Sequence, residues 1–221
     1  TLRIDSDTTS KKGSMEKMLL GFKEGSAQIL IGTQAVAKGL DFPNVALVGI
    51  ISADTALNMP DFRSGERTFQ LITQVAGRAG RGDTPGLVYV QTYSPESFAI
   101  KSACKLNITD FYKDELNIRY KAFYPPFCSM LNIVFKGRHE DLVKQEADRL
   151  KELLYNNYRN DVEIYGPVPA PRSRVKDNYR YNILLKGKKA QILIDIARVI
   201  QTLNKNKQVA VAWDMDPQDL L

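Results

Sequence analysis

The sequence predicts an α/β first part followed by a second part of α+β type. Up to about residue 105, short apolar runs alternate with helical patterns, which is the order of parallel βαβ units in an open sheet. From residue 129 onward the expected elements follow the order βαββαβ, the split arrangement of ferredoxin-like domains. We therefore expect one domain over residues 1–105, a helical connector over 106–128 and a second domain over 129–221.

The first part is expected to hold helices and strands in alternation. Residues 14–25 and 66–79 space their apolar side chains along one helical face, and a glycine ends the first of these segments. Residues 27–33, 44–54 and 86–93 are short apolar runs typical of buried strands. In open sheets of this kind, ligands bind beyond the carboxyl ends of the strands.

The second part begins after a helix over 110–121, where Pro125 and Pro126 interrupt the chain. The later helices are expected over 140–158 and 190–203, because both segments are amphipathic with a helical period. A long proline- and arginine-rich loop is expected after the second of the strands. The strands are expected over residues 130–136, 162–166, 179–186 and 208–215.

Composition limits the class of protein. The chain has 221 residues, 43% of them hydrophobic, and no apolar run approaches the roughly 20 residues of a membrane span, so we expect a cytoplasmic protein without a membrane partner. Cys104, Cys128 and His139 are too few for a structural zinc site, so both cysteines are expected to be reduced and no metal ligands are expected in this chain.

Positive charge is concentrated in one segment. The net charge is +6, and residues 172–189 alone carry as much, with seven lysines and arginines against Asp177. Cations interleaved with tyrosines are typical of sequence-tolerant binding to single-stranded nucleic acid. The alternative is a solvated loop whose tyrosines pack on the sheet. The candidate DNA-binding residues here are Arg172, Arg174, Lys176, Tyr179 and Arg180.

A second candidate site is the stretch QVAGRAGRGDTPG, which follows a predicted helix. Gln74, Arg78 and Arg81 are spaced by four and three residues, so a helix end presents them on roughly one face. Two fixed guanidiniums suit a phosphate whose charge grows during phosphoryl transfer. Taken alone, the stretch is equally compatible with a glycine-rich surface turn that makes salt bridges or binds phosphate in general.

The upstream context GTQAVAKGLDFPNV, together with QVAGRAGRG, resembles motifs V and VI of superfamily 2 helicases. With RIDSDTT, PDFRSGERTFQ, RYKAFYPPF, GPVPAPRSRVKDNYRYNILLK and WDMDP in order along the chain, the sequence resembles the PriA family of helicases that restart replication. The resemblance covers essentially the whole chain. It implies a RecA-like second helicase lobe followed by a domain resembling ribosomal protein S10.

The resemblance also implies roles for individual residues. Arg81 would be the arginine finger on the γ-phosphate, Arg78 its companion, and Gln74 would place the attacking water or the phosphate. Gly39 and Asp41 would lie at the nucleotide, although Asp41 is also compatible with a turn carboxylate. Thr33 would contact the DNA backbone. Lys188, Lys189 and Gln191 are candidates for binding the acidic tail of the single-stranded DNA-binding protein SSB.

The same resemblance implies an ATP-dependent 3′ to 5′ DNA helicase that recognises stalled or forked DNA and promotes primosome assembly. ATP and Mg²⁺ would be bound mainly by another lobe, because the sequence contains no GxxxxGK[ST] loop and no DExH-like sequence. The family carries zinc on cysteines upstream of the segment matched here. We therefore expect a fragment that is inactive alone, with forked and single-stranded DNA, SSB and other primosome proteins as partners. The alternative is a standalone nucleic-acid-binding or scaffolding protein.

Overall fold

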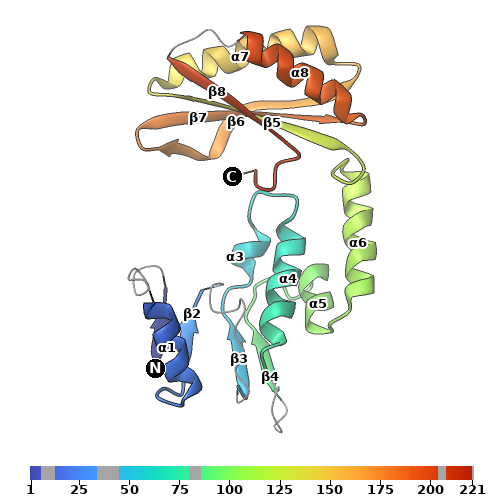
Figure 1. Cartoon of the computed structure of the whole chain (residues 1–221). Helices are drawn as coiled ribbons and strands as arrows, with labels where there is room; N and C mark the ends of the chain where they lie inside the picture. The colour runs from blue at the N-terminus through green and yellow to red at the C-terminus, as the bar shows by residue number, and fades with distance from the viewer. Residues whose placement is uncertain (6–12, 34–44, 80–85, 204–207, 221) are drawn as a thin grey trace. The chain divides into compact units, whose positions relative to one another are not determined.

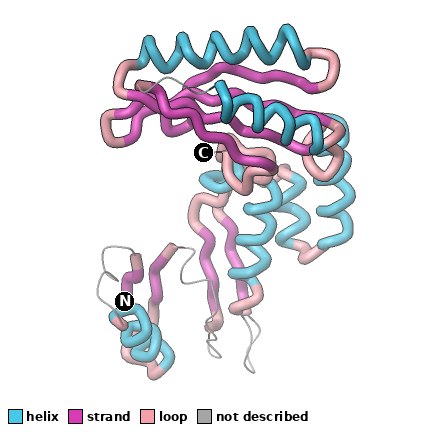
Figure 2. The backbone as a smooth tube through the Cα atoms, turned by 45° about the horizontal axis from the view of Figure 1, so that its top comes forward, coloured by secondary structure: helices cyan, strands magenta, loops and turns pink. Residues whose placement is uncertain are grey.

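The computed structural model describes residues 1–5, 13–33, 45–79, 86–203 and 208–220. The chain forms two compact units, of which the first holds Thr1–Met59 and Ser64–Tyr112 and the second holds Pro60–Arg63 and Lys113–Leu221. The segment proposed as a connector is thus divided between the units, and four residues from the first half of the chain belong to the second unit. Figure 2 distinguishes helices, strands and loops.

The first unit contains parallel strand pairs, as the βαβ pattern predicts, although the strand β1 was not predicted. β1 (Leu2–Ile4) pairs in parallel with β2 (Leu30–Gly32), and α1 (Ser14–Lys23) lies between them in the sequence. β3 (Leu47–Ile50) pairs in parallel with β4 (Leu87–Val90). Among the described residues these pairs form separate two-stranded sheets. The parallel βαβ pattern is therefore confirmed for each pair.

Three further helices belong to this unit: α3 (Asp54–Leu57), α4 (Ser64–Ala76) and α5 (Phe98–Cys104). The sequence pattern predicts α4 but not α3 or α5, because helices this short show little periodicity. α4 buries Phe69 and Ile72 in a core with residues of β3, α3, α5 and α6. The rings of Phe69 and Phe111 stack there at 4.1 Å between centroids.

The second unit is the expected βαββαβ domain. Its strands lie in the order β6, β7, β5, β8, and every neighbouring pair is antiparallel. The helix α6 (Ile108–Lys121) precedes this domain and crosses the division between the units. The likeness to ribosomal protein S10 stays a prediction. The elements are β5 (Ser129–Gly137), α7 (Glu140–Tyr158), β6 (Val162–Val175), β7 (Asn178–Gly187), α8 (Ala190–Leu203) and β8 (Val209–Met215).

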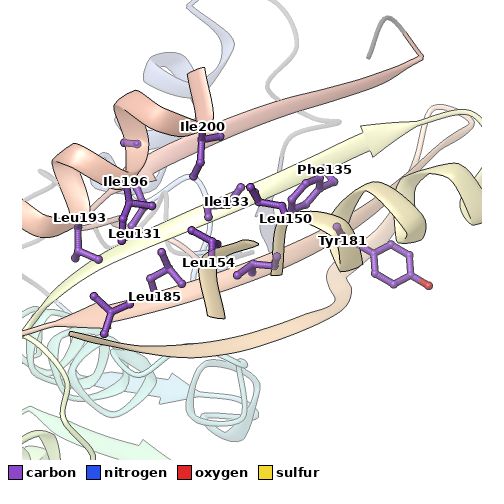
Figure 3. Close-up of a cluster of buried hydrophobic side chains, with 14 of the residues drawn as sticks. Leu131, Ile133, Phe135, Leu150, Leu154, Tyr181, Leu185, Leu193, Ile196 and Ile200 are labelled. Atoms are coloured by element: carbon purple, nitrogen blue, oxygen red, sulfur yellow. The ribbon is translucent and has the colours of Figure 1, made fainter. Parts of the chain in front are cut away.

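α7 and α8 cover one face of this sheet (Figure 1). Alternate residues of β5, namely Leu131, Ile133 and Phe135, are fully buried beneath the helices, as the period of two along a strand requires (Figure 3). Tyr181 lies at the margin of this core, and its hydroxyl donates a hydrogen bond to Glu140 Oε1 at 3.0 Å. This carboxylate raises the pKa of Tyr181.

The predicted long loop between β6 and β7 is wrong. β6 continues through the proline- and arginine-rich segment to Val175, and only Lys176 and Asp177 connect it to β7. Both of these residues have positive φ (48° and 58°), the conformation that a two-residue hairpin turn requires. Prolines are compatible with this strand because β6 lies at the edge of the sheet, where alternate backbone N–H groups need no partner strand.

Both cysteines are free, as predicted. Cys104 is exposed, whereas burial raises the pKa of the Cys128 thiol to about 11. No helix in the described ranges has the length and apolar character needed to cross a membrane.

We predict that Gly166→Ala destabilises the second unit by about 1–3 kcal/mol. Gly166 has a φ of +96°, and an added Cβ would lie 2.6 Å from the carbonyl oxygen of Asn182 in β7. Trp213 is the single tryptophan and lies in β8 of the same sheet, so its fluorescence during urea unfolding measures the change. Gly187→Ala is the control, because its nearest neighbours are side-chain carbons at 3.3 Å or more. Equal midpoints for the two variants would contradict the prediction.

Candidate functional site

The carboxyl end of α4 presents the predicted glutamine and the first predicted arginine. Hydrogen bonds continue the helical winding past Ala76, since Gly77 N donates to Thr73 O at 3.1 Å and Arg78 N donates to Val75 O at 3.0 Å. Gln74 and Arg78 therefore remain about one helical turn apart. Gln74 is exposed and Arg78 is half-buried. The structure thus brings these two predicted residues together at one helix end.

Gly77 lies between them in the sequence and has room for a side chain among the described residues. Its φ is outside the left-handed region, and an added Cβ would meet Thr73 O at 3.5 Å and Gln74 O at 3.6 Å, which is ordinary contact. Glycine in a helical turn costs about 0.5–1 kcal/mol relative to alanine. Alanine would therefore fit at this position without a steric conflict.

The other residues predicted for the nucleotide site are only in part within the described ranges. Gly39, Asp41 and Arg81 lie outside the described residues. Thr33 directly follows β2 and is exposed. Its place at the carboxyl end of a parallel strand is where ligands of such sheets bind.

Sequence reasoning missed a buried carboxylate at the carboxyl ends of β3 and β4. Asp54 accepts a hydrogen bond from Thr92 Oγ1 at 3.0 Å and another from the backbone N–H of Tyr93 at 3.0 Å. The Tyr93 N–H is the main cause that lowers the pKa of Asp54. Asp54 ties the loop after β4 to the first turn of α3. The available signal was an acidic residue at the carboxyl end of the predicted strand 44–54.

Three of the predicted DNA-binding residues lie around the tip of the β6–β7 hairpin. Arg174 pairs with Tyr179 across the hairpin, and its guanidinium carbon lies 5.4 Å from the centre of the Tyr179 ring. Arg174 also forms an ion pair with Asp177 at 3.0 Å, and both side chains are mostly exposed. Lys176 forms the turn itself. The alternative in which tyrosines pack on the sheet holds for Tyr181, which is buried, but not for Tyr179, which is half-buried.

Arg180 lies on the other face of β7 and has a cationic neighbour that sequence reasoning missed. Lys136 of β5 pairs directly with Arg180, so both side chains project from the face that α7 and α8 leave uncovered. Like charges opposite one another across strands destabilise a sheet. The pair gives this part of the sheet a concentrated positive charge. Finding it from sequence would have required the register between β5 and β7.

Arg172 is exposed in β6, within the irregular stretch between the Pro169 and Arg174 pairings. The predicted cations are therefore divided between the hairpin tip and the uncovered face of the sheet. We call Lys136, Arg172, Arg174, Lys176, Tyr179 and Arg180 the basic hairpin.

The residues predicted to bind an acidic tail lie at the start of α8. Lys188 and Lys189 are exposed just before the helix, where the helix dipole adds positive potential. Gln191 donates a hydrogen bond to Asp195 Oδ1 at 3.0 Å, and Arg198 contacts the same oxygen at 3.1 Å. Asp195 thus adds a negative charge one turn from Gln191 and about two turns from the lysines.

Within the described ranges, no group of three or more histidine, cysteine, aspartate or glutamate side chains is arranged to hold a metal ion.

Comparison with known proteins agrees with the two units. Residues 1–83 match the helicase conserved C-terminal domain, and residues 121–218 match the primosomal protein N C-terminal domain. The replication restart protein PriA of Bacillus subtilis is 43% identical over 98% of this chain, and that of Haemophilus influenzae is 40% identical over 99%. The PriA protein of Treponema pallidum is 35% identical over 99% of the chain.

The chain spans only 27% of the Bacillus subtilis relative, 30% of the Haemophilus influenzae relative and 33% of the Treponema pallidum relative. Across that span the similarity is continuous and includes both units. The chain belongs to the PriA family.

Proposed function

We propose that this chain supplies the second motor lobe and a DNA-binding domain of an ATP-dependent 3′ to 5′ DNA helicase. The observation that carries the proposal is the end of α4, where an exposed glutamine and an arginine lie one turn apart beside a glycine with space for closer approach of another group. This end lies within the residues that match a helicase C-terminal domain. The helicase would act at stalled or forked DNA and promote primosome assembly.

The proposed nucleotide chemistry is electrostatic. During phosphoryl transfer, negative charge spreads over the γ-phosphate oxygens, and an arginine from a second lobe stabilises that charge. Arg81 is assigned this role, with Arg78 as its companion and Gln74 orienting water or phosphate. Gly39 and Asp41 are assigned to the nucleotide edge.

The remaining region of the protein would hold the phosphates and Mg²⁺, because this sequence has no phosphate-binding loop. Turnover then requires both parts, and this chain alone is proposed to be inactive. The zinc of the family is assigned to that other region as well. The proposed setting of the reaction is the cytoplasm.

DNA binding is assigned to the basic hairpin and Thr33. The hairpin combines mobile phosphate-binding cations with one half-exposed aromatic ring, which suits single-stranded or forked DNA without sequence preference. Lys188, Lys189 and Gln191 are proposed to bind the acidic tail of SSB, with Asp195 setting a limit on the affinity. The alternative of a standalone scaffold would need cations but no glutamine beside them, and membership of a helicase family leaves it without support.

We predict that Arg78→Ala and Arg81→Ala each lower ATP hydrolysis at least about 10²-fold, the effect of removing one preorganised donor. Arg81→Ala should reach about 10³-fold, as expected for an arginine finger. The measurement is steady-state hydrolysis with forked DNA, in a protein where this chain is joined to the remaining region of a PriA relative.

Arg149→Ala is the matched control, because Arg149 is an exposed arginine on α7 paired with Glu146. DNA affinity should stay unchanged in all three variants. Reduced DNA affinity with normal hydrolysis would instead assign these arginines to nucleic-acid binding and overturn the proposal.

We predict that Lys136→Ala and Arg180→Ala weaken binding to single-stranded DNA of any sequence. Each lost phosphate contact should reduce the slope of log K against log salt by about 0.7. Titrations by fluorescence anisotropy at several salt concentrations measure the slope. Arg149→Ala again serves as the control.

A substitution at the hairpin tip is expected to raise the affinity for DNA instead of lowering it. Asp177→Asn removes the ion pair that occupies Arg174, so binding should tighten. Weaker binding of Asp177→Asn, or salt slopes equal to wild type for both cation variants, would show that DNA does not contact the basic hairpin.

A further inference from the structure

The segment Pro60–Arg63 connects two helices of the first unit, yet it belongs to the second unit. α3 ends at Leu57 and α4 begins at Ser64, so these four residues leave one unit and return to it. Connections between helices are usually exposed and polar. Here Asp61 is 7% exposed and Phe62 and Arg63 are half-buried, which indicates a specific attachment.

Polar contacts tie this segment to the last described residues of the chain. Arg63 Nη1 donates to the carbonyl oxygen of Pro217 at 2.7 Å, and the backbone N–H of Leu220 donates to Asp61 Oδ2 at 3.4 Å. The other Asp61 oxygen accepts the Arg63 backbone N–H at 2.8 Å, which closes the local turn. The C-terminal segment is itself fixed to β5, where Asp216 and Met130 exchange two hydrogen bonds of 2.8 Å.

An alternation of aromatic rings and cations fixes the same segment to the sheet. The ring of Phe62 stacks on Tyr124 at 4.7 Å and 6°, with Arg63 at 4.1 Å and Arg119 at 5.1 Å from the Phe62 ring. On Tyr124, Lys186 of β7 lies 3.5 Å from the ring and donates to Ala122 O at 3.0 Å. We call Asp61, Phe62, Arg63, Arg119, Tyr124 and Lys186 the aromatic clamp; all of them lie in the second unit.

The aromatic clamp removes positively charged side chains from water, which is unfavourable and which an exposed link between the helices would not require. Lys186 is 4% exposed, and burial lowers its pKa. The Arg119 side chain is 12% exposed, and its charge is balanced by Glu115 at 2.7 Å. Burying charges is unfavourable unless aromatic faces, carbonyls and carboxylates compensate, as they do here. A short link between helices, here residues 58–63, needs no such environment.

We infer that Phe62 and Arg63 are positioning residues that couple the C-terminal unit to the Gln74 and Arg78 end of α4. The coupling is covalent and short, because Ser64, the first residue of α4, directly follows Arg63. α4 is a single helix of 13 residues, about 20 Å long, held along its length by Phe69 and Ile72. A displacement of the clamp therefore acts on the amino end of the helix whose carboxyl end carries the proposed catalytic residues.

This inference rests on the proposed function and deepens it: DNA held by the C-terminal unit would change the placement of the arginines, and ATP would in turn change DNA affinity. Coupling between two ligands is reciprocal and is typically 5- to 150-fold. Variants of the aromatic clamp should lose this coupling between DNA and ATP, while DNA and ATP each still bind.

The test uses the chain joined to the remaining region of a PriA relative, with Phe62→Ala and Arg63→Ala. The measured quantities are the affinity for forked DNA with and without a non-hydrolysable ATP analogue, and the stimulation of ATP hydrolysis by DNA. The first ratio is the DNA affinity with the ATP analogue against the affinity without it, and the second is the rate of ATP hydrolysis with DNA against the rate without it. Both ratios should fall at least about fivefold in the clamp variants. DNA affinity without nucleotide should remain at the wild-type value. Phe62→Tyr keeps the stacked ring and should restore the coupling.

Phe127→Ala is the matched control, because the exposed ring of Phe127 contacts the ring of Tyr120 in the same unit. The Phe127 backbone N–H donates to Tyr124 O at 3.0 Å, and alanine keeps that hydrogen bond. Folded clamp variants with wild-type coupling would overturn the inference alone, provided that Arg78→Ala still abolishes hydrolysis. Wild-type hydrolysis in Arg78→Ala would overturn the proposed function, and the inference with it. Arg63→Ala keeps the Phe62 ring. If Phe62→Ala does not fold, the coupling between DNA and ATP measured in Arg63→Ala tests the inference.

Discussion

The burial of Phe69 and Ile72 fixes the rotation of α4 about its own axis, and the account of the nucleotide site depends on that constraint. Successive residues of a helix turn by about 100°, so Gln74 lies about 200° from Ile72 and faces away from the core. Arg78, four residues further along, lies close to the direction of Gln74. The Phe69 and Phe111 rings are stacked, so a rotation of α4 would lose this favourable contact. The apolar packing of α4 therefore determines the direction in which the proposed catalytic residues Gln74 and Arg78 project.

In the second unit, the constraint is that the sheet must remain stable although several cations repel one another on it. Its hydrophobic core cluster lies on the side of α7 and α8, where Leu131, Ile133 and Phe135 are fully buried. On the opposite face, Lys186 is buried in the aromatic clamp, whereas Lys136 and Arg180 lie further along the strands, and phosphate would relieve their mutual repulsion. At the hairpin tip, Asp177 balances Arg174 in the absence of nucleic acid. Stability and binding are thus assigned to different faces of one sheet.

Much of this arrangement follows from local sequence patterns. α7 and α8 are observed over the ranges that their periodicity predicts, because long amphipathic helices have the strongest signal. The long loop predicted between β6 and β7 is wrong, because the proline- and arginine-rich segment forms an edge strand, where prolines are tolerated. α3 and α5 are too short for periodicity to reveal them.

Long-range contacts explain what local patterns could not provide. Lys136 joins the basic hairpin only through the register of β5 and β7. Phe62 contacts Tyr124 and Arg119 of the aromatic clamp, both of which are distant from it in the sequence. The pairing of Gln74 with Arg78 was predictable because both lie on one helix. The roles of Arg81, Asp41 and Gly39 remain assignments from the family motifs.

The most direct test of the central claim is complementation of ATP hydrolysis. This chain and the separately expressed remaining region of a PriA relative would be assayed alone and mixed, each with and without forked DNA. The account predicts hydrolysis only in the mixture, with stimulation by DNA, because each part holds half of the nucleotide site. Hydrolysis by the other region alone at the rate of the mixture would contradict the account, since this chain would then contribute nothing to catalysis.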